Sequence, residues 1–357
     1  MNREVLLVLN TNYHVETALS VYESLRMIGF NPTILLDHRP QFINPEILDY
    51  ELKDFLRKYE IPFITYEEFV TKENVNYYKY IYISGGVFLK GLTDSKFVEK
   101  KKTLIDRSKS NSVLISHVAD YSDFYKYARP HFIDPIIISV TNFSQRYGLN
   151  FFFQIENPII SNLEKPKPKD TLSFLTLGRF CWDNRNIHYI EELLKIDSEL
   201  PSKIELWFIG QKPITNKFEK IQNQRLQNID IKIKFDVSEI ELYDHINKCD
   251  FIVSLIDHNF EDYFKRKFTS NINHIVAFNK PSLCFMPLNL AYNIPCIEYD
   301  IDDFSEKVKK CLYMGYQGRQ EMSESFELAK HNMRVHNELT LSRLFAEEIS
   351  SAHFSIA

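Results

Sequence analysis

REVLLVLNTNYHVETALSVYESLRMIGFNPTILLD (Arg3–Asp37) decides the fold class of this chain. Residues 3–10 are an almost continuous apolar run, as expected for a strand buried on both faces of a parallel sheet. Residues 15–29 carry apolar side chains at helical spacing and end on Gly29, a residue typical of helix C-caps. Residues 32–37 then form a second strand pattern. A strand, a helix and a strand in this order predict a doubly wound α/β domain.

The same alternation continues along the chain. Further strands are expected in the first half at residues 79–84, 112–116 and 135–140. In the second half they are expected at residues 171–177, 203–210, 231–235, 250–256 and 281–285. Helices are expected between them, near residues 186–196, 239–248, 271–278 and 302–312, and the amphipathic tail 321–349 should pack as closing helices.

A chain of 357 residues suits two domains of ordinary size. The segment NLEKPKPKD, residues 162–170, places two prolines among lysines and predicts a stiff, solvated connector. We therefore expect an N-terminal Rossmann-like domain over 1–161, a second one over 171–330 and a closing C-terminal helix over 331–357. Two such domains facing across a cleft would bind a ligand at the carboxyl ends of both sheets.

Composition and charge exclude several classes of protein. A hydrophobic content of 44% supports two packed cores, and the net charge of −5 argues against a nucleic-acid binder. The five cysteines have neither zinc-finger nor redox spacing, which indicates a reduced, cytoplasmic protein. The N-terminal apolar run is too short for a signal peptide or a membrane span, so contact with a membrane would be peripheral, at its inner face.

Common cofactor and metal motifs are missing from the sequence. The first strand is followed by NTNYH, residues 10–14, rather than by G-x-G-x-x-G, which disfavours a nicotinamide enzyme. No Walker-type GK[ST] loop and no H-E-x-x-H motif occur. We therefore expect neither a bound cofactor nor a catalytic metal ion.

Two arginines interrupt the join between a strand and a helix. The stretch TLGRFCWDNRN, Thr176–Asn186, places Arg179 and Arg185 in a polar loop behind a buried strand pattern. Paired guanidinium groups at such a position can bind a diphosphate through charge-assisted hydrogen bonds. The alternative is that both arginines are ordinary surface residues.

A second polar turn carries the residues of a helix start. Thr269, Ser270 and Asn271 stand at N-cap positions ahead of an apolar helical pattern. The free N–H groups and the positive dipole end of a helix suit phosphate. This turn and the arginine loop could hold a diphosphate from both sides, although an ordinary helix cap would show the same pattern.

The order of these segments resembles the GT-B glycosyltransferases, in particular the group 1, family 4-like enzymes of surface polysaccharide synthesis. IENPI, residues 155–159, resembles the turn that closes their N-terminal domain, and KIELWFIGQ, residues 203–211, resembles a strand that follows later. LGRFCWDNRNIHYIEELL, residues 177–194, resembles "GRxxxxKG…LIEA", with Arg185 near the usual lysine. FTSNINHIVAFNKPSLC, residues 268–284, resembles "SxxxxEAMAxGxPVI". The similarity covers most of the chain through the order and spacing of the motifs.

The resemblance implies a metal-independent enzyme that moves a sugar from a UDP- or GDP-linked donor to a glycan or a lipid-linked glycan. Arg179 and Arg185 would then stabilise the leaving group, and the turn Phe235–Val237 would hold the base through its backbone. The donor-binding residues that it implies are Asn12, His14, Gly178, Arg179, Arg185, Gly210, Phe235, Asp236, Val237, Thr269, Ser270 and Asn271.

The chain departs from the family at a pair of glutamates. Arg266 and His274 stand where many retaining members carry them. This leaves open whether the reaction retains or inverts the configuration of the transferred sugar. It also keeps two alternatives: a catalytically silent GT-B domain that binds glycan or a partner protein, and a sugar-nucleotide epimerase.

His117 is the preferred candidate for a catalytic base in the first domain. The expected strand SVLIS ends just before it, which places its imidazole at the carboxyl edge of the sheet. A neutral imidazole can accept the proton of an acceptor hydroxyl. His14 and Asp120 are weaker rivals, and a hydrogen-bonded histidine at a strand end is the alternative.

Two other stretches of the first domain allow more than one interpretation. The lysine-rich run Lys96–Ser110 could contact an anionic membrane, but a solvated helix face explains it as well. The paired glycines in Ser84–Gly91 favour a turn, with an acceptor loop as the alternative.

Overall fold

The computed structural model describes residues 3–10, 15–37, 45–72, 76–117, 127–140, 150–151, 157–160, 163, 171–178, 188–210, 221, 224, 226–265 and 269–354. The chain forms two compact units. Unit 1 comprises residues 1–159, 266–268 and 332–357, and unit 2 comprises residues 160–265 and 269–331. Of the expected connector 162–170, only Leu163 lies within the described residues.

Unit 1 is built on a seven-stranded sheet of order β3-β2-β1-β4-β5-β6-β7, in which every neighbouring pair is parallel. The strands are β1 (Glu4–Leu9), β2 (Asn31–Leu36), β3 (Phe63–Thr65), β4 (Lys79–Tyr82), β5 (Ser112–Ser116), β6 (Ile136–Ser139) and β7 (Asn150–Phe151). The expected strands of this half are confirmed. β3 and β7 were not expected, because runs of three and two residues are too short to show a strand pattern.

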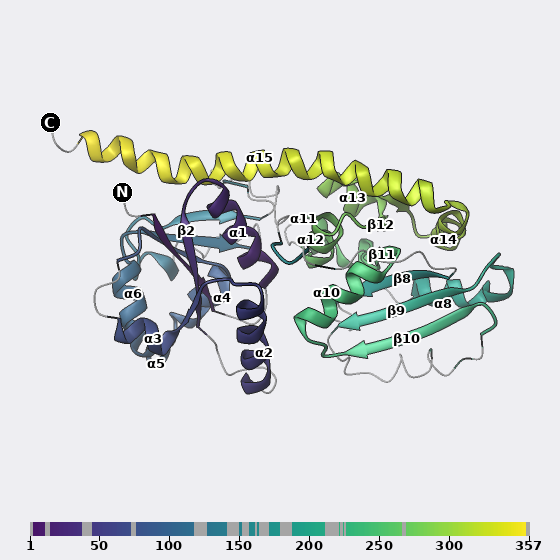
Figure 1. The fold of residues 1–357 in the computed structure, drawn as a ribbon, viewed down its shortest axis with the longest axis horizontal. Helices are drawn as coiled ribbons and strands as arrows, with labels where there is room; N and C mark the ends of the chain where they lie inside the picture. The colour runs from purple at the N-terminus through teal and green to yellow at the C-terminus, as the bar shows by residue number, and fades with distance from the viewer. Residues whose placement is uncertain are drawn as a thin grey trace. The chain divides into compact units, whose positions relative to one another are not determined.

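The helices of unit 1 connect these parallel strands (Figure 1). They are α1 (Val15–Met27), α2 (Pro45–Lys58), α3 (Tyr66–Thr71), α4 (Gly85–Gly91), α5 (Ser95–Lys100) and α6 (Lys102–Ser108). The expectation of a turn in Ser84–Gly91 is wrong, because this segment is the helix α4. The two glycines open the helix, where they cost less than in its middle, and Phe88 and Leu89 anchor it in the core.

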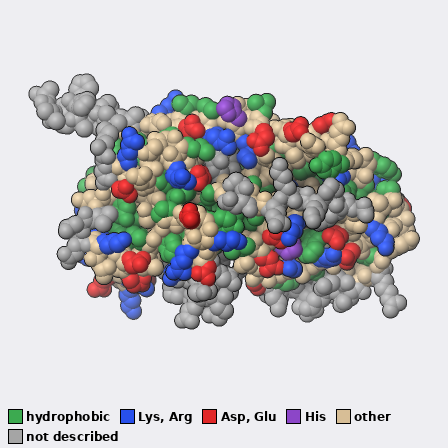
Figure 2. Space-filling view, viewed as in Figure 1, with side chains coloured by type: hydrophobic (Ala, Val, Ile, Leu, Met, Phe, Trp, Pro, Cys, Tyr) green, Lys and Arg blue, Asp and Glu red, His purple; other side chains and the backbone are tan. Residues whose placement is uncertain are grey.

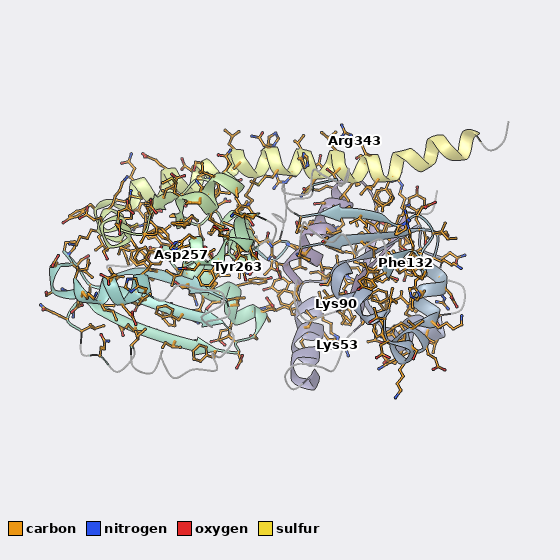
Figure 3. The ribbon with its side chains drawn as sticks, turned by 180° about the vertical axis from the view of Figure 1, so that it is seen from behind. Lys53, Lys90, Phe132, Asp257, Tyr263 and Arg343 are labelled. Atoms are coloured by element: carbon orange, nitrogen blue, oxygen red, sulfur yellow. The ribbon has the colours of Figure 1, made fainter. Side chains whose placement is uncertain are left out.

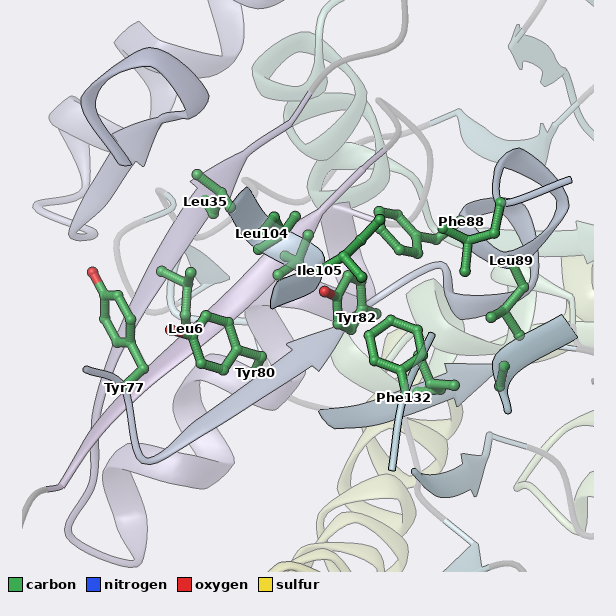
Figure 4. Close-up of a cluster of buried hydrophobic side chains, with 14 of the residues drawn as sticks. Leu6, Leu35, Tyr77, Tyr80, Tyr82, Phe88, Leu89, Leu104, Ile105 and Phe132 are labelled. Atoms are coloured by element: carbon green, nitrogen blue, oxygen red, sulfur yellow. The ribbon is translucent and has the colours of Figure 1, made fainter. Parts of the chain in front are cut away.

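The core of unit 1 is aromatic (Figure 4). Tyr82 packs with its ring centroid 4.5 Å from that of Phe88 and 5.6 Å from that of Phe132. Its hydroxyl lies 2.7 Å from the hydroxyl of Ser108, so the buried phenol keeps a polar partner. β1 supports this core with side chains that are almost completely buried from Val5 to Leu9.

Unit 2 contains a second parallel sheet, of order β10-β9-β8-β11-β12-β13. Its strands are β8 (Leu172–Leu177), β9 (Ile204–Gly210), β10 (Ile229–Phe235), β11 (Phe251–Ser254), β12 (Ser282–Phe285) and β13 (Ile297–Tyr299). Figure 1 shows β8, β9 and β10 side by side. The expected strands are confirmed, and β13 is an additional three-residue strand at the sheet edge.

The helical segments of unit 2 follow the expected alternation. They are α8 (His188–Lys195), the short 3-10 helices η3 (Asp197–Glu199) and η4 (His258–Phe260), α10 (Glu239–Lys248), α11 (Asp262–Lys265), α12 (Ser270–Ala277), α13 (Met286–Tyr292) and α14 (Phe304–Tyr313). α10 begins at Glu239 because the hydroxyl of Ser238 accepts a hydrogen bond from the backbone N–H of Glu241, at 3.3 Å. All four expected helices of this half are confirmed to within two residues at each end.

The chain closes with one long helix, α15 (Tyr316–Phe354), rather than with several helices from residue 321. Its last part belongs to unit 1, where the ring of Phe345 lies 4.2 Å from Phe30 and 5.7 Å from Tyr78 between centroids. The hydroxyl of Tyr78 donates to the backbone carbonyl of Phe345 at 3.4 Å. An earlier part belongs to unit 2, where Lys330 donates to the carbonyl of Ala277 at 3.0 Å.

Candidate functional site

Backbone hydrogen bonds join the ends of three adjacent strands of unit 2, β8, β9 and β10. The N–H of Gly178, just after β8, donates to the carbonyl of Ile209 at 3.1 Å. The N–H of Asp236, just after β10, donates to the carbonyl of Gly210 at 2.9 Å. Gly178 and Asp236 both turn into positive φ, at 116° and 54°, so the chain leaves the sheet abruptly at this edge.

Gly210 can only be a glycine. A Cβ atom added there would lie 2.7 Å from the carbonyl carbon of Gly178 and closer still to its oxygen, and both are backbone atoms that cannot rotate away. Both glycines are half-buried. The close packing of the ends of β8 and β9 therefore requires glycine at position 210.

The helix α12 starts at the same edge. It follows β11 and leads into β12, so in a parallel sheet its N-terminus lies beside the carboxyl ends of the strands. Thr269 is the N-cap residue and is 2% exposed, and its side chain makes no capping hydrogen bond. The backbone N–H groups of the first turn are thus not capped by that side chain.

Several of the residues predicted to bind the sugar donor lie at the carboxyl edge of the sheet in unit 2. They are Gly178, Gly210, Phe235, Asp236, Val237, Thr269, Ser270 and Asn271. Asn12, His14, Arg179 and Arg185 lie outside the described residues, as do Asp120 and Arg266. The role of every one of these residues in binding stays a prediction.

The two ends of the arginine loop are described, and both are fixed. Gly178 is held by β9, and Tyr189 in the first turn of α8 donates its hydroxyl to the carboxylate of Asp257 at 3.1 Å. Asp257, labelled in Figure 3, follows β11 and is completely buried, and it also accepts from the N–H of Asn259 at 2.9 Å. Burial and the neighbouring Asp257 raise the pKa of Tyr189, which keeps the phenol protonated as a donor.

The sequence did not predict the hydrogen bond between Tyr189 and Asp257. The one available signal was an acidic residue placed directly behind the apolar run that forms β11, a position that faces the ligand edge of a parallel sheet. Tyr189 gave no signal, because an aromatic residue at helical spacing is usually a core residue.

Tyr189→Phe should lower the free energy of unfolding of unit 2 by about 1.5 kcal/mol, since a buried hydrogen bond to a carboxylate is lost while the ring is kept. Chemical denaturation followed by fluorescence would measure the change. Tyr316→Phe is the control, because Tyr316 is 64% exposed. Equal stability of Tyr189→Phe and the parent would contradict the proposed anchoring of the loop.

His117 in unit 1 lies where the sequence predicts it. It directly follows β5, at the carboxyl edge of the sheet, and is half-buried. Its Nε2 lies 3.0 Å from the carbonyl oxygen of Ile83. A carbonyl only accepts, so Nε2 carries the hydrogen, and a neutral ring holds its lone pair on Nδ1.

His274, one of the positions aligned with the family's glutamates, is a core residue. It is 7% exposed on α12, and its ring lies 6.0 Å from Tyr243 and 6.5 Å from Phe278 between centroids. Among the residues that the structure describes, no group of three or more His, Cys, Asp or Glu side chains is arranged to hold a metal ion.

The lysine-rich run Lys96–Ser110 is not a uniformly solvated helix face. Lys101 is 3% exposed and pairs with the buried carboxylate of Asp37 behind β2, while Arg107 donates to backbone carbonyls of Phe69 and Lys72. Figure 2 shows positive and negative side chains intermixed across the visible described surface. None of the described helices has the length and apolar character to cross a bilayer.

Comparison with known proteins gives similarity in structure only. No family model and no curated protein sequence matches the chain. A glycosyltransferase from Rickettsia africae ESF-5 is similar at a TM-score of 0.54 and 15% identity, with 97% of each chain covered. An alpha-glucosyltransferase in complex with UDP and a 13-mer DNA is similar at 0.55 and 12%, covering 97% of this chain and 98% of that one. An alpha,alpha-trehalose-phosphate synthase (UDP-forming) from Burkholderia vietnamiensis is similar at 0.53 and 9%, with 99% of each chain covered.

These likenesses extend over nearly the whole chain. Together with the two parallel sheets, they establish an α/β fold of two Rossmann-like units, the GT-B fold.

Proposed function

We propose that the protein is a glycosyltransferase that moves a sugar from a nucleotide sugar to a hydroxyl acceptor. The observation that carries this proposal is the carboxyl edge of the sheet in unit 2. There Gly178, Gly210 and the turn at Asp236 lie at the ends of neighbouring strands, and α12 begins at the same edge of the sheet. The GT-B fold supports it, since the similar structures include enzymes whose names specify glycosyl transfer.

The charge that develops on the sugar donor suits the carboxyl edge of the sheet in unit 2. When the bond between sugar and phosphate breaks, negative charge grows on the departing nucleoside diphosphate. Arg179, Arg185 and the backbone N–H groups at the start of α12 would stabilise that charge. Gly178 and Gly210 would lie beside the diphosphate, and the turn Phe235–Val237 would hold the base.

The acceptor would bind in unit 1. The imidazole of His117 would accept the proton of the attacking hydroxyl, and the contact of its Nε2 with the carbonyl of Ile83 would orient the ring. In a retaining mechanism the leaving phosphate would take that proton instead, so the test of His117 also bears on the stereochemistry.

The acceptor class we propose is a glycan or a lipid-linked glycan in surface polysaccharide synthesis, and the donor is UDP- or GDP-linked. One similar structure contains DNA, but the net charge of −5 of this chain argues against a nucleic acid as the acceptor. An enzyme that acts on such an acceptor would lie in the cytoplasm and would contact the inner face of the membrane peripherally.

Two alternatives make different predictions. A silent GT-B domain that binds glycan or a partner protein would bind a nucleotide at most and would transfer nothing. An epimerase would convert one sugar nucleotide into another without an acceptor, and it would need carboxylates beside the sugar. Product analysis with a panel of UDP- and GDP-sugars, with and without glycan acceptors, separates the three.

Arg179→Ala and Arg185→Ala should each weaken the binding of the correct nucleoside diphosphate by about 1.5–3 kcal/mol, because a charge-assisted contact is lost. Isothermal titration with UDP and GDP measures the affinity. Arg179→Lys should restore it only in part if the contact is bidentate. Arg57→Ala, at an exposed position on α2, is the matched control. Parental affinity in both loop variants would remove the arginines from the site.

Turnover should survive exhaustive treatment with EDTA, because the proposed site neutralises the leaving group with guanidinium groups and helix N–H groups. Assays in excess chelator, with and without added Mg²⁺ or Mn²⁺, test this. A loss of activity that either ion restores would show that the arginines and the helix do not suffice.

A further inference from the structure

One face of α15 carries apolar side chains that the function proposed above does not use. Leu328, Val335 and Leu339 are 69%, 42% and 53% exposed. They follow one another at intervals of seven and four residues. In a helix with 3.6 residues per turn these intervals return to the same side. The three side chains therefore form one row along α15, which we call the apolar row.

The apolar row lies opposite the buried side of α15. Phe326, Asn337 and Leu341 are 0%, 0% and 1% exposed, and each stands about half a turn around the helix from the row. Single exposed apolar residues are common on protein surfaces. A row with intervals of seven and four, however, is the pattern of a helix that packs against a second helix. The buried side already anchors α15, so the row is available to a partner.

Charged side chains mark the two ends of the apolar row. Glu321 and Glu324 precede Leu328, and Arg343 follows Leu339 by one turn, and all three charged side chains are exposed. By helix geometry they stand within about 60° of the row. Arg343 is labelled on α15 in Figure 3. One face of this helix therefore has a negative end, an apolar middle and a positive end.

A second copy of the same face complements this pattern when the two helices run in opposite directions. Placing Leu328 of one copy against Leu339 of the other also creates the reciprocal contact, because a two-fold axis repeats every contact. The same register places Glu324 level with Arg343 of the second copy, at both ends of the row. A parallel pair would instead place glutamate against glutamate and arginine against arginine.

The middle of the apolar row is polar. His331 and Asn332 are exposed there, close to the two-fold axis of such a pair. Polar side chains at this place in a helix pair fix its register and lower its stability. The face is also short, about 33 Å from Glu321 to Arg343 at 1.5 Å per residue. An interface of this size belongs to the transient class, so the dimer should dissociate on dilution.

We infer that a second copy of this chain docks on the apolar row of α15, with the two helices antiparallel. Each copy supplies the same surface, so the contact closes on itself and produces dimers rather than filaments. The inference goes beyond the proposed function and is independent of nucleotide and acceptor.

Sedimentation velocity of the full-length protein from about 1 to 200 μM covers the range of transient dimers. The parent should dimerise as its concentration rises. Leu328→Glu and Leu339→Glu should each raise the dissociation constant by at least about tenfold, because each variant buries a carboxylate at two symmetric contacts. Val70→Glu is the matched control, since Val70 is an exposed apolar residue on α3. It should dimerise as the parent does.

Exchanging charges tests the antiparallel direction. Arg343→Glu, and in a second protein Glu321→Lys with Glu324→Lys, should each weaken the dimer by about tenfold, because both ends become repulsive. An equimolar mixture of the two proteins should associate as tightly as the parent, since each end then pairs opposite charges. A parallel pair predicts no loss in either protein, because like charges already face each other in its parent.

The inference is overturned by a parent that stays monomeric over the whole range, or by Leu328→Glu and Leu339→Glu proteins that dimerise like the parent. Charge variants that associate no better when mixed would overturn it as well. Flotation of the parent with vesicles of phosphatidylcholine and phosphatidylglycerol tests another occupant. A monomeric parent that binds vesicles through the same leucines would assign the row to a membrane and also overturn the inference. Thermal melts check folding, and glutamine replaces either leucine if glutamate unfolds the protein.

Discussion

His117→Ala is expected to lower the rate of sugar transfer by roughly 100- to 10,000-fold, the usual effect of removing a general base. Nucleotide affinity should stay at the parental value, because the proposed nucleotide site lies in unit 2. His117→Gln is the sharper variant, since its amide nitrogen can still donate to the carbonyl of Ile83 while the side chain cannot take up a proton. Single-turnover rates of the three proteins, with the donor and acceptor found by screening, measure the effect.

His131→Ala is the control for that experiment. His131 is also partly buried in unit 1, but it precedes β6 and so lies toward the amino side of the sheet, and burial lowers its pKa. Its replacement should leave the transfer rate unchanged. Parental turnover in His117→Gln together with a slow His117→Ala would mean that the ring acts only through its hydrogen bond to Ile83. Parental turnover in both would move the search for a base to His14 and Asp120, or to a retaining mechanism.

Gly210→Ala should lower the free energy of unfolding by about 3 kcal/mol, at the upper end for overpacking, because the added methyl group meets backbone rather than a mobile side chain. The ends of β8 and β9 must separate to admit it, which displaces the turns at Gly178 and Asp236 from the proposed donor site. Nucleotide affinity should therefore fall at least about tenfold, as for the loss of one or more hydrogen bonds. Denaturant titration and calorimetry on the same preparation give both quantities.

Gly318→Ala makes the same chemical change where the structure can absorb it. An added Cβ there meets only the side chain of Met314, which can move, and the position lies within α15, where alanine is the better helix former. We expect this variant to be at least as stable as the parent. A Gly210→Ala protein as stable as Gly318→Ala would contradict the close packing of β8 and β9.

The sequence predicts the sheets well because burial on both faces gives parallel strands an unmistakable composition. β1 is buried from Val5 to Leu9, and its almost unbroken apolar run could be recognised without any partner. β3 and β13 are three-residue strands that complete the sheets, and their identity depends on the strand beside them rather than on their own residues. Such strands become visible only once the fold is known.

The residues of the candidate site also differ in whether the sequence could predict them. His117 is predicted from the sequence because it stands where a strand pattern ends, whereas Gly178 and Gly210 are predicted as site residues through the resemblance to the family's motifs. Tyr189 and Asp257 are in contact although they stand 68 positions apart, so no local pattern could show this pair. The buried pair of Lys101 and Asp37 was missed because lysine-rich runs usually form solvated helix faces.

The central claim is that the protein transfers a sugar from a nucleotide sugar, and the most direct measurement is the release of nucleoside diphosphate. The parent and the Arg179→Ala variant would be incubated with a panel of UDP- and GDP-sugars in the presence of glycan acceptors, and the products identified by mass spectrometry. We predict that the parent releases UDP or GDP from one donor, forms a glycosylated acceptor in equal amount, and does so far faster than the variant. A parent that releases neither nucleotide and forms no glycosylated product from any donor would contradict the account.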